Sequence, residues 1–212
     1  MRRLAAPRLQ PARSLPSLQV VLLVLLAVSL AACTSAPDTF TGSRLQKPYQ
    51  AADIALTDTS GSPYSLGQDT TKPLTVVFFG YTHCPDYCPM VMNNLAAAMN
   101  RLDAEDRKQV DVVFVTTDPA RDDQATLRRY LDRYDKSFIG LTGDLETIIE
   151  VGDPLHVYVN DGVELPSGGY DLGGHSTFTL AIDSDHKAIA LWNQETSSTE
   201  FAADFHTLLT ED

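Results

Sequence analysis

Two cysteines, Cys84 and Cys88, stand where an apolar run gives way to a helical pattern, with three residues between them. The second falls in the first turn of a helix that we expect to begin at Pro85 or Pro89. Unpaired N–H groups and the positive end of the helix dipole favour a thiolate over a thiol at such a place. Two facing thiolates can close to a disulfide or hold a soft metal ion such as Cu(I) or zinc. The spacing alone leaves both chemistries open.

His175 is the third candidate, because it immediately precedes a predicted strand over residues 176–182. In a thioredoxin-like fold the residue that opens this strand faces the cysteine pair, and ordinary thioredoxins have a cis proline there. Here the residues are Gly174-His175-Ser176, without a proline. An imidazole at this place completes a set of two sulfur donors and one nitrogen donor, which suits copper as both Cu(I) and Cu(II). A lone histidine is usually a surface or core residue, and its position relative to the cysteines favours the ligand role here.

The elements that must position these residues alternate between apolar strands and amphipathic helices. Residues 74–79 form a continuous apolar run typical of a buried central strand, and residues 110–115 form a second one. The order predicts an α/β protein with a thioredoxin-like fold, an N-terminal hairpin extension and an inserted hairpin-loop before the last strands. The other expected elements are an entry hairpin from residue 51, helices from about residue 85 or 89 to 102 and over 123–134, 144–151 and 200–209, short strands over 138–141 and 156–159, a glycine-rich loop over 164–174, and a final hairpin over 176–182 and 188–192.

The first 47 residues are predicted to be a leader and a tether. Four arginines precede an apolar run over residues 20–32, shorter than the roughly 20 residues that a membrane-spanning helix needs. A basic start, a short apolar core and small residues at its end indicate an export signal. Leu30-Ala31-Ala32-Cys33 resembles the bacterial lipobox, in which the cysteine is lipidated. We expect a lipoprotein signal peptide over 1–32, a flexible tether over 33–47 that begins at lipidated Cys33, and a folded domain over 48–212; an ordinary secretory signal is the alternative.

The charge balance narrows the choice of partners. The chain of 212 residues has 16 basic and 28 acidic residues. Loss of the four leader arginines leaves 12 basic residues against 28 acidic ones, a formal charge of −16. Nucleic-acid binding rests on basic contacts to phosphate, so this composition argues against a nucleic-acid partner. It also argues against a peripheral electrostatic hold on anionic lipid, so that membrane attachment would rest on the lipid anchor.

Three segments together resemble the Sco (SenC) family of copper chaperones. Residues 79–89, FGYTHCPDYCP, are similar to that family's signature around the cysteine pair. Residues 117–122, TDPARD, are similar to its Asp-Pro-x-Arg-Asp segment, and residues 174–178, GHSTF, fall where the family has its ligand histidine. The similarity runs from about residue 50 to 209, with the order and spacing of the family throughout.

The resemblance implies a thioredoxin fold in which Cys84, Cys88 and His175 bind copper and Asp118 lies close to the site. Gly174 departs from the polar residue expected before the histidine, which puts one supporting contact to the ligand in doubt. Members of the family help metallate the binuclear copper centre of cytochrome c oxidase, as copper donors or as dithiol reductants. The resemblance therefore implies an assembly factor, not a turnover enzyme, and the lipobox-like sequence at Cys33 predicts a lipid anchor at the extracytoplasmic membrane face. Its partner would be the copper-bearing oxidase subunit or another copper chaperone.

Two other functions compete with this one. The first is an extracytoplasmic thiol–disulfide oxidoreductase or thiol peroxidase that uses the Cys84/Cys88 pair; the absent cis proline and the presence of His175 argue against it. The second is a plain structural or adhesion lipoprotein, which leaves the cysteine and histidine set unexplained. His83, which adjoins Cys84, is a weaker ligand candidate. Met90 and Met92 are also weaker candidates, because their helical spacing favours a role in core packing.

Overall fold

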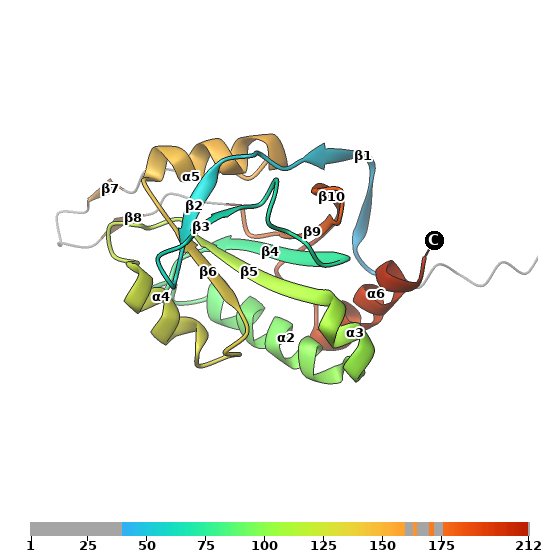
Figure 1. The fold of residues 1–212 in the computed structure, drawn as a ribbon. Helices are drawn as coiled ribbons and strands as arrows, with labels where there is room; N and C mark the ends of the chain where they lie inside the picture. Colours follow the sequence, from blue (N-terminus) through green and yellow to red (C-terminus); the bar gives the residue numbers. More distant parts are fainter. Residues whose placement is uncertain (1–39, 160–162, 165–169, 172–175, 212) are drawn as a thin grey trace, which may run out of the picture. The chain divides into compact units, whose positions relative to one another are not determined.

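A mixed sheet carries the fold and runs in the order β1-β10-β9-β4-β5-β6-β2-β3 (Figure 1). The computed structural model describes residues 40–159, 163–164, 170–171 and 176–211. In this part of the chain the sheet has eight strands, and β7 and β8 form a separate antiparallel pair. The strands are β1 (Ser43–Gln50), β2 (Ala55–Asp58), β3 (Pro63–Ser65), β4 (Leu74–Gly80), β5 (Val110–Thr116), β6 (Ile139–Thr142), β7 (Val163–Glu164), β8 (Tyr170–Asp171), β9 (Thr179–Asp183) and β10 (Lys187–Trp192).

Helices cover both faces of the sheet, which explains why every residue of β4 is buried. They are α2 (Tyr87–Arg101), α3 (Ala104–Gln109), α4 (Gln124–Leu131), α5 (Leu145–Gly152) and α6 (Ser198–Thr210). Side chains alternate along a strand, so Val76 and Phe78 pack in the core with α2, α4 and α6, whereas Val77 and Phe79 pack in the core with α5. Figure 1 shows α5 on one side of the sheet and α2 on the other.

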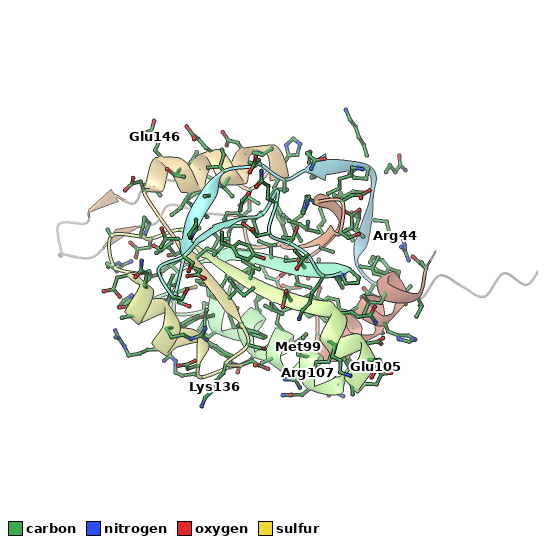
Figure 2. The ribbon with its side chains drawn as sticks, in the orientation of Figure 1. Arg44, Met99, Glu105, Arg107, Lys136 and Glu146 are labelled. Carbon is green, nitrogen blue, oxygen red and sulfur yellow. The ribbon has the colours of Figure 1, made fainter. Side chains whose placement is uncertain are left out.

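The strand register brings three segments together at the carboxyl ends of β4 and β5: the loops that follow these two strands and the residues that precede β9. β4 and β5 are parallel, with Gly80 opposite Thr116, so the segments that follow these two strands leave the sheet together. β9 is antiparallel to β4, with Thr179 opposite Phe78, so the residues that precede β9 lie at that same edge. Charged side chains such as Glu105, Lys136 and Glu146 instead point outward at the periphery (Figure 2).

Most predicted elements are confirmed, including the entry hairpin β2–β3, the final hairpin β9–β10 and the inserted pair β7–β8. The strand predicted over 156–159 is wrong. A 3₁₀ turn over Asp153–Leu155 is followed by His156 in the left-handed region, and the N–H of Val157 donates to Gly152 O. This local turn closes the end of α5 and prevents extended pairing at the start of the segment.

The domain also begins earlier than residue 48, so the predicted tether is too long at its C-terminal end. β1 starts at Ser43 and pairs with β10 as an edge strand. Asp204, which is buried in α6, accepts the backbone N–H groups of Thr41 (3.0 Å) and Gly42 (2.9 Å) and the indole N–H of Trp192 (2.7 Å). These contacts fix the segment before β1 to the domain. The rest of the predicted tether, and the signal peptide, lie outside the described residues.

Candidate metal centre

Cys84 and Cys88 lie on either side of the start of α2. The N–H of Cys84 donates to Tyr81 O at 3.3 Å in the loop, and the N–H of Cys88 donates to the sulfur of Cys84 at 3.4 Å. Asp86 occupies the N-cap position but its side chain caps no helical N–H, so the Cys84 sulfur serves as an acceptor for the first turn. Neither cysteine forms a disulfide; Cys84 is half-buried and Cys88 is fully buried. The two sulfurs lie next to each other, as the spacing predicts, and their role as metal ligands stays a prediction.

The two sulfurs have opposite acidities. The pKa of Cys84 is lowered to about 5, chiefly because Cys88 donates a hydrogen bond to its sulfur, with further N–H groups and the Tyr81 hydroxyl also donating. The pKa of Cys88 is raised, because it donates that bond and because it is buried. Near neutral pH the pair is therefore one thiolate and one thiol. A metal ion that binds both sulfurs must displace the proton of Cys88.

Gly80 makes room for the buried sulfur. A Cβ atom at this position would lie 2.9 Å from Cys88 Sγ and 2.8 Å from a ring carbon of Phe78. Cβ atoms do not approach other heavy atoms so closely, so any larger residue would displace the sulfur or the ring. The end of β4 is thus shaped to receive the first turn of α2. The same glycine accepts the N–H of Thr117 at 2.7 Å, which ties the two neighbouring loops together.

A buried carboxylate, Asp122, holds the cysteine loop against the loop after β5. It accepts the N–H of Thr82 at 2.9 Å, the hydroxyl of Thr82 at 2.5 Å and the hydroxyl of Thr116 at 2.8 Å. His83 Nδ1 lies 3.7 Å from the same carboxylate. Sequence reasoning gave Asp122 no role beyond its place in the TDPARD segment. The sequence did offer one signal. Asp122 ends the TDPARD segment, this segment follows the buried strand β5, and β5 is parallel to β4, which ends at the cysteine loop.

Asp118 lies on the same loop, at the edge of the sheet where the cysteines stand. Its carboxylate pairs with Arg121 through Arg121 Nε, and its own N–H donates to Thr116 Oγ1 at 3.0 Å. Burial raises the pKa of Asp118, and the hydrogen bond from Arg121 opposes that shift. The positive charge of Arg121 acts in turn on Tyr81, whose hydroxyl bonds to Cys84. Asp118 is therefore linked to the cysteines through two intervening side chains.

Tyr81 and the three weaker ligand candidates differ in their contacts with the cysteine pair. Tyr81 packs against the core and donates to the Cys84 sulfur; its pKa is raised to about 12, mainly by burial and then by the two cysteines. Met92 is buried in the core under α2, as predicted, whereas Met90 is 37% exposed. The ring of His83 is exposed and contacts Thr82 Oγ1 at 3.1 Å. Tyr81 thus supports the thiolate directly, a role that the sequence did not reveal.

His175 and Cys33 lie outside the described residues, so their predicted roles stay predictions. The residue after the histidine is placed: the N–H of Ser176 donates to Tyr158 O at 3.0 Å, and Ser176 Oγ accepts the N–H of Tyr158 at 2.9 Å. Three residues later, Thr179 pairs with Phe78 of β4. Over the part of the chain with described coordinates, no cluster of three histidine, cysteine or carboxylate side chains is suited to a metal ion.

No helix among the described residues has the length and apolar character needed to span a bilayer. The described part of the candidate site consists of one thiolate and one adjacent thiol at a helix start, beside a buried carboxylate network. Such a pair can ligate a soft metal or exchange disulfides.

Comparison with known proteins shows which family this chain resembles. The family model described as SCO1/SenC matches residues 42–210. An SCO2-like protein of Rickettsia felis is 32% identical over 153 residues, which cover 70% of this chain and 71% of the relative. The chain spans about half the length, 44% to 52%, of four other curated relatives.

Solved structures of Sco proteins are also similar to this chain. The copper-bound ScoI of Bradyrhizobium japonicum has a TM-score of 0.65 at 30% identity, and the match covers 75% of this chain and 99% of ScoI. BsSco, described as a Sco-family cytochrome c oxidase assembly protein with a disulfide switch, has a TM-score of 0.61 at 19% identity, over 79% of this chain and 99% of its own. The second likeness concerns the fold alone. The predicted thioredoxin-like fold is confirmed.

Proposed function

This chain belongs to the SCO1/SenC family, and on that premise we propose that it is a copper metallochaperone whose ion is bound by Cys84, Cys88 and His175. The observation that carries the proposal is the hydrogen-bonded sulfur pair at the start of α2. Cu(I) prefers soft thiolate donors, and an imidazole adds the nitrogen donor that suits Cu(II). Ser176 stands at the edge of the sheet where β4 ends, which supports His175 as the third ligand.

The proposed task is to assist copper insertion into the binuclear copper centre of cytochrome c oxidase. The partner is then the copper-bearing subunit of the oxidase or another copper chaperone, and the protein acts as an assembly factor, not as a turnover enzyme. Family membership, the soft donor pair and the copper-bound relative support this assignment. The lipobox-like sequence that ends at Cys33 supports a lipid anchor at the extracytoplasmic membrane face.

A specific observation favours a second function, thiol–disulfide exchange. A half-buried thiolate at Cys84 beside a buried, protonated Cys88 is the arrangement of an attacking and a resolving thiol. Reduction of the cysteines of a copper centre would use these same groups. The two functions differ in their need for copper, since exchange requires only the sulfurs.

Anaerobic titration of the reduced protein with Cu(I) and Cu(II) tests the proposed function. One tightly bound ion per chain is expected, with loss of tight binding in Cys84→Ser and Cys88→Ser and in the oxidised protein, because ligation needs reduced, deprotonated sulfur. Met90→Leu is a matched control that removes an exposed sulfur next to the site while conserving volume. Stoichiometric tight binding by the oxidised protein would exclude the cysteines as the ligands.

A further inference from the structure

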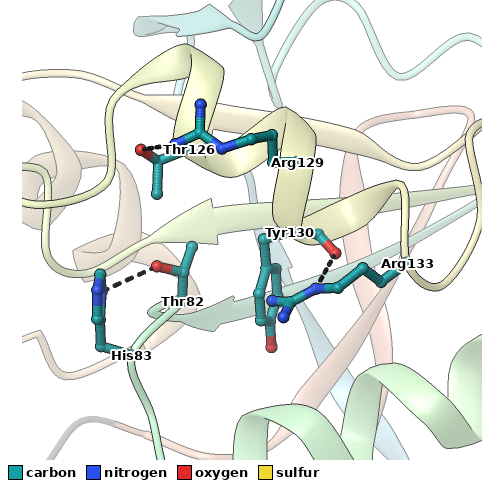
Figure 3. Close-up of a pocket in the computed structure, with 6 residues that line it drawn as sticks. All are labelled: Thr82, His83, Thr126, Arg129, Tyr130 and Arg133. Atoms are coloured by element: carbon teal, nitrogen blue, oxygen red, sulfur yellow. Dashed lines mark hydrogen bonds between the residues drawn. The ribbon is translucent and has the colours of Figure 1, made fainter.

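A cavity of about 450 Å³ opens beside the cysteine loop and is lined by Thr82, His83, Thr126, Arg129, Tyr130 and Arg133 (Figure 3). Two of these residues come from the loop itself, immediately before Cys84. The other four come from α4 and the residues just after it. An occupant of this cavity would therefore contact the segment that carries the reactive sulfur.

The two arginines of this cavity differ from most basic side chains among the described residues. Most basic side chains in the described part of the chain form ion pairs, as expected where acidic residues are in excess. Arg129 and Arg133, by contrast, form none within the described residues. The carboxylate whose pKa is influenced by Arg129, that of Asp123, accepts a hydrogen bond from the N–H of Thr126. Two guanidinium groups thus remain available to an external anion.

Both guanidinium groups are held in place by uncharged groups. Arg129 Nη2 donates to Thr126 Oγ1 at 3.0 Å, and Arg133 Nε donates to Tyr130 O at 3.4 Å. The Arg133 guanidinium also lies 4.8 Å from the centre of the Tyr130 ring. These contacts use one N–H of each group and leave other N–H donors, whose planar fork suits a carboxylate. Figure 3 shows both arginines on the α4 side of the cavity, opposite His83.

The neighbouring surface is suited to a polypeptide. Three large hydrophobic side chains are exposed among the described residues, and two of them, Tyr87 and Met90, lie in the first turns of α2 beyond Cys84. Exposed apolar side chains beside a reactive group favour contact with another protein. Cys84 thus follows two residues that line the cavity, Thr82 and His83, and precedes two exposed apolar residues, Tyr87 and Met90.

We propose that this cavity receives an aspartate or glutamate side chain of the protein that exchanges copper or disulfides with Cys84, from a segment that also carries a cysteine. The proposal deepens the proposed function by specifying the chemistry of its partner. It concerns a local contact, because the charge of the whole chain, −12, repels an acidic partner at longer range.

Synthetic peptides test this contact without copper. Two acetylated pentapeptides carry a central cysteine activated as a 2-thiopyridyl mixed disulfide, with glutamate on both sides in one and glutamine in the other. The Cys84 thiolate attacks the peptide sulfur, the S–S bond to the pyridyl group breaks, and pyridine-2-thiolate leaves with the electron pair and is protonated to the absorbing thione. The rate of its release in the reduced protein measures access to Cys84.

The glutamate peptide is expected to react about three- to fivefold faster than the glutamine peptide, an advantage typical of exposed ion pairs. The net charge of the protein predicts the opposite order, so the direction of the difference is decisive. Arg129→Gln/Arg133→Gln should abolish the advantage while copper stoichiometry is unchanged. Arg101→Gln/Lys108→Gln, which removes the same charge at the last residue of α2 and in α3, should retain it.

Equal rates for the two peptides, a faster glutamine peptide, or an advantage that survives in Arg129→Gln/Arg133→Gln would overturn the proposal. The peptide assay contains no copper, so these outcomes count against the acidic contact alone. Failure of the proposed function would appear separately, in the copper titration. Circular dichroism of both double variants checks that they are folded, which is expected because all four substituted side chains are exposed.

Discussion

Asp122 accepts hydrogen bonds from both the backbone N–H and the hydroxyl of Thr82, which precedes it by 40 residues. The carboxylate is fully buried and also accepts the hydroxyl of Thr116. Asp122→Ala leaves these donors without their acceptor and should lower the free energy of unfolding by roughly 2–4 kcal/mol. Because Thr82 lies two residues before Cys84, the cysteine loop should loosen and the Cu(I) affinity should fall. Urea unfolding and competition with a Cu(I) chelator measure the two effects.

Asp204→Ala provides the control for this prediction. Asp204 is also a buried acceptor of several hydrogen bonds, but it fixes the segment before β1 and the indole of Trp192. Its loss should destabilise the domain by a similar amount without changing the Cu(I) affinity of the folded protein. An equal loss of copper affinity in both variants, measured where each is folded, would contradict a specific role for Asp122.

Gly80→Ala should damage the site through a steric clash. Its Cβ would lie 2.9 Å from Cys88 Sγ, and overpacking of a buried position costs about 1–3 kcal/mol. Displacement of the Cys88 sulfur would weaken its hydrogen bond to Cys84, so the pKa of Cys84 should rise and copper binding should weaken. Gly143→Ala is the control, because its Cβ would meet only the end of the Leu56 side chain, at 3.0 Å. Normal thiol acidity in Gly80→Ala would show that the site tolerates the displacement.

The acidity of Cys84 predicts a specific pH dependence of its reactivity. With a pKa of about 5, the rate of alkylation by iodoacetamide should be nearly constant from pH 8 to pH 6 and half-maximal near pH 5. In Cys88→Ala the principal hydrogen bond to the sulfur is lost, so the midpoint should move up toward the ordinary value near 9. An unchanged midpoint in that variant would assign the low pKa to another cause.

The same pKa shifts predict how pH affects stability. Because folding lowers the pKa of Cys84, its thiolate stabilises the fold fully above pH 9, and this contribution is lost as the pH falls through about 5. Folding raises the pKa of Cys88, whose contribution is present below pH 9 and is lost above it. The stability advantage of the reduced wild type over the Cys84→Ala/Cys88→Ala variant should therefore increase from pH 5 to about pH 9. Chemical unfolding across this range measures it.

Much of the fold can be predicted from the sequence, because the pattern of β4 and β5 reflects local burial. A continuous apolar run such as residues 74–79 occurs where both faces of a strand are covered. β1 is harder to predict, because it is an edge strand with mostly exposed side chains and an irregular register. α3 is also missed, because it has only six residues and is set by the cap of Asp103 on Glu105 and Asp106.

For the site, the cysteine pair can be predicted because helix geometry and spacing are local properties. The role of Asp122 cannot, because it depends on a parallel register that brings residues 82 and 122 together. The strand expected over 156–159 fails for a similar reason: its alternation does not show that Gly152 O accepts the N–H of Val157. Contacts set by tertiary structure leave little trace in a single sequence.

Cys33→Ala should release the protein from membranes into a soluble extracytoplasmic fraction. The prediction rests on Leu30-Ala31-Ala32-Cys33 after a short apolar run. Fractionation of cells and metabolic labelling with a fatty acid measure the change. Cys88→Ala is the control, because it removes a thiol without affecting the lipobox-like sequence. Continued membrane retention of the unlabelled Cys33→Ala protein would rule out lipid anchoring as the means of attachment.

The central claim, a copper site with two sulfur ligands and one imidazole, is tested most directly by anaerobic copper titration of His175→Ala, followed by absorption spectroscopy. We predict a large loss of Cu(II) affinity and a changed thiolate-to-copper absorption band. Cu(I), which tolerates two thiolate ligands, should be affected less, and disulfide exchange with a small thiol should stay near normal. Unchanged affinity for both copper forms in His175→Ala, together with a reductase activity that Cys84→Ser abolishes, would contradict the account and favour the oxidoreductase.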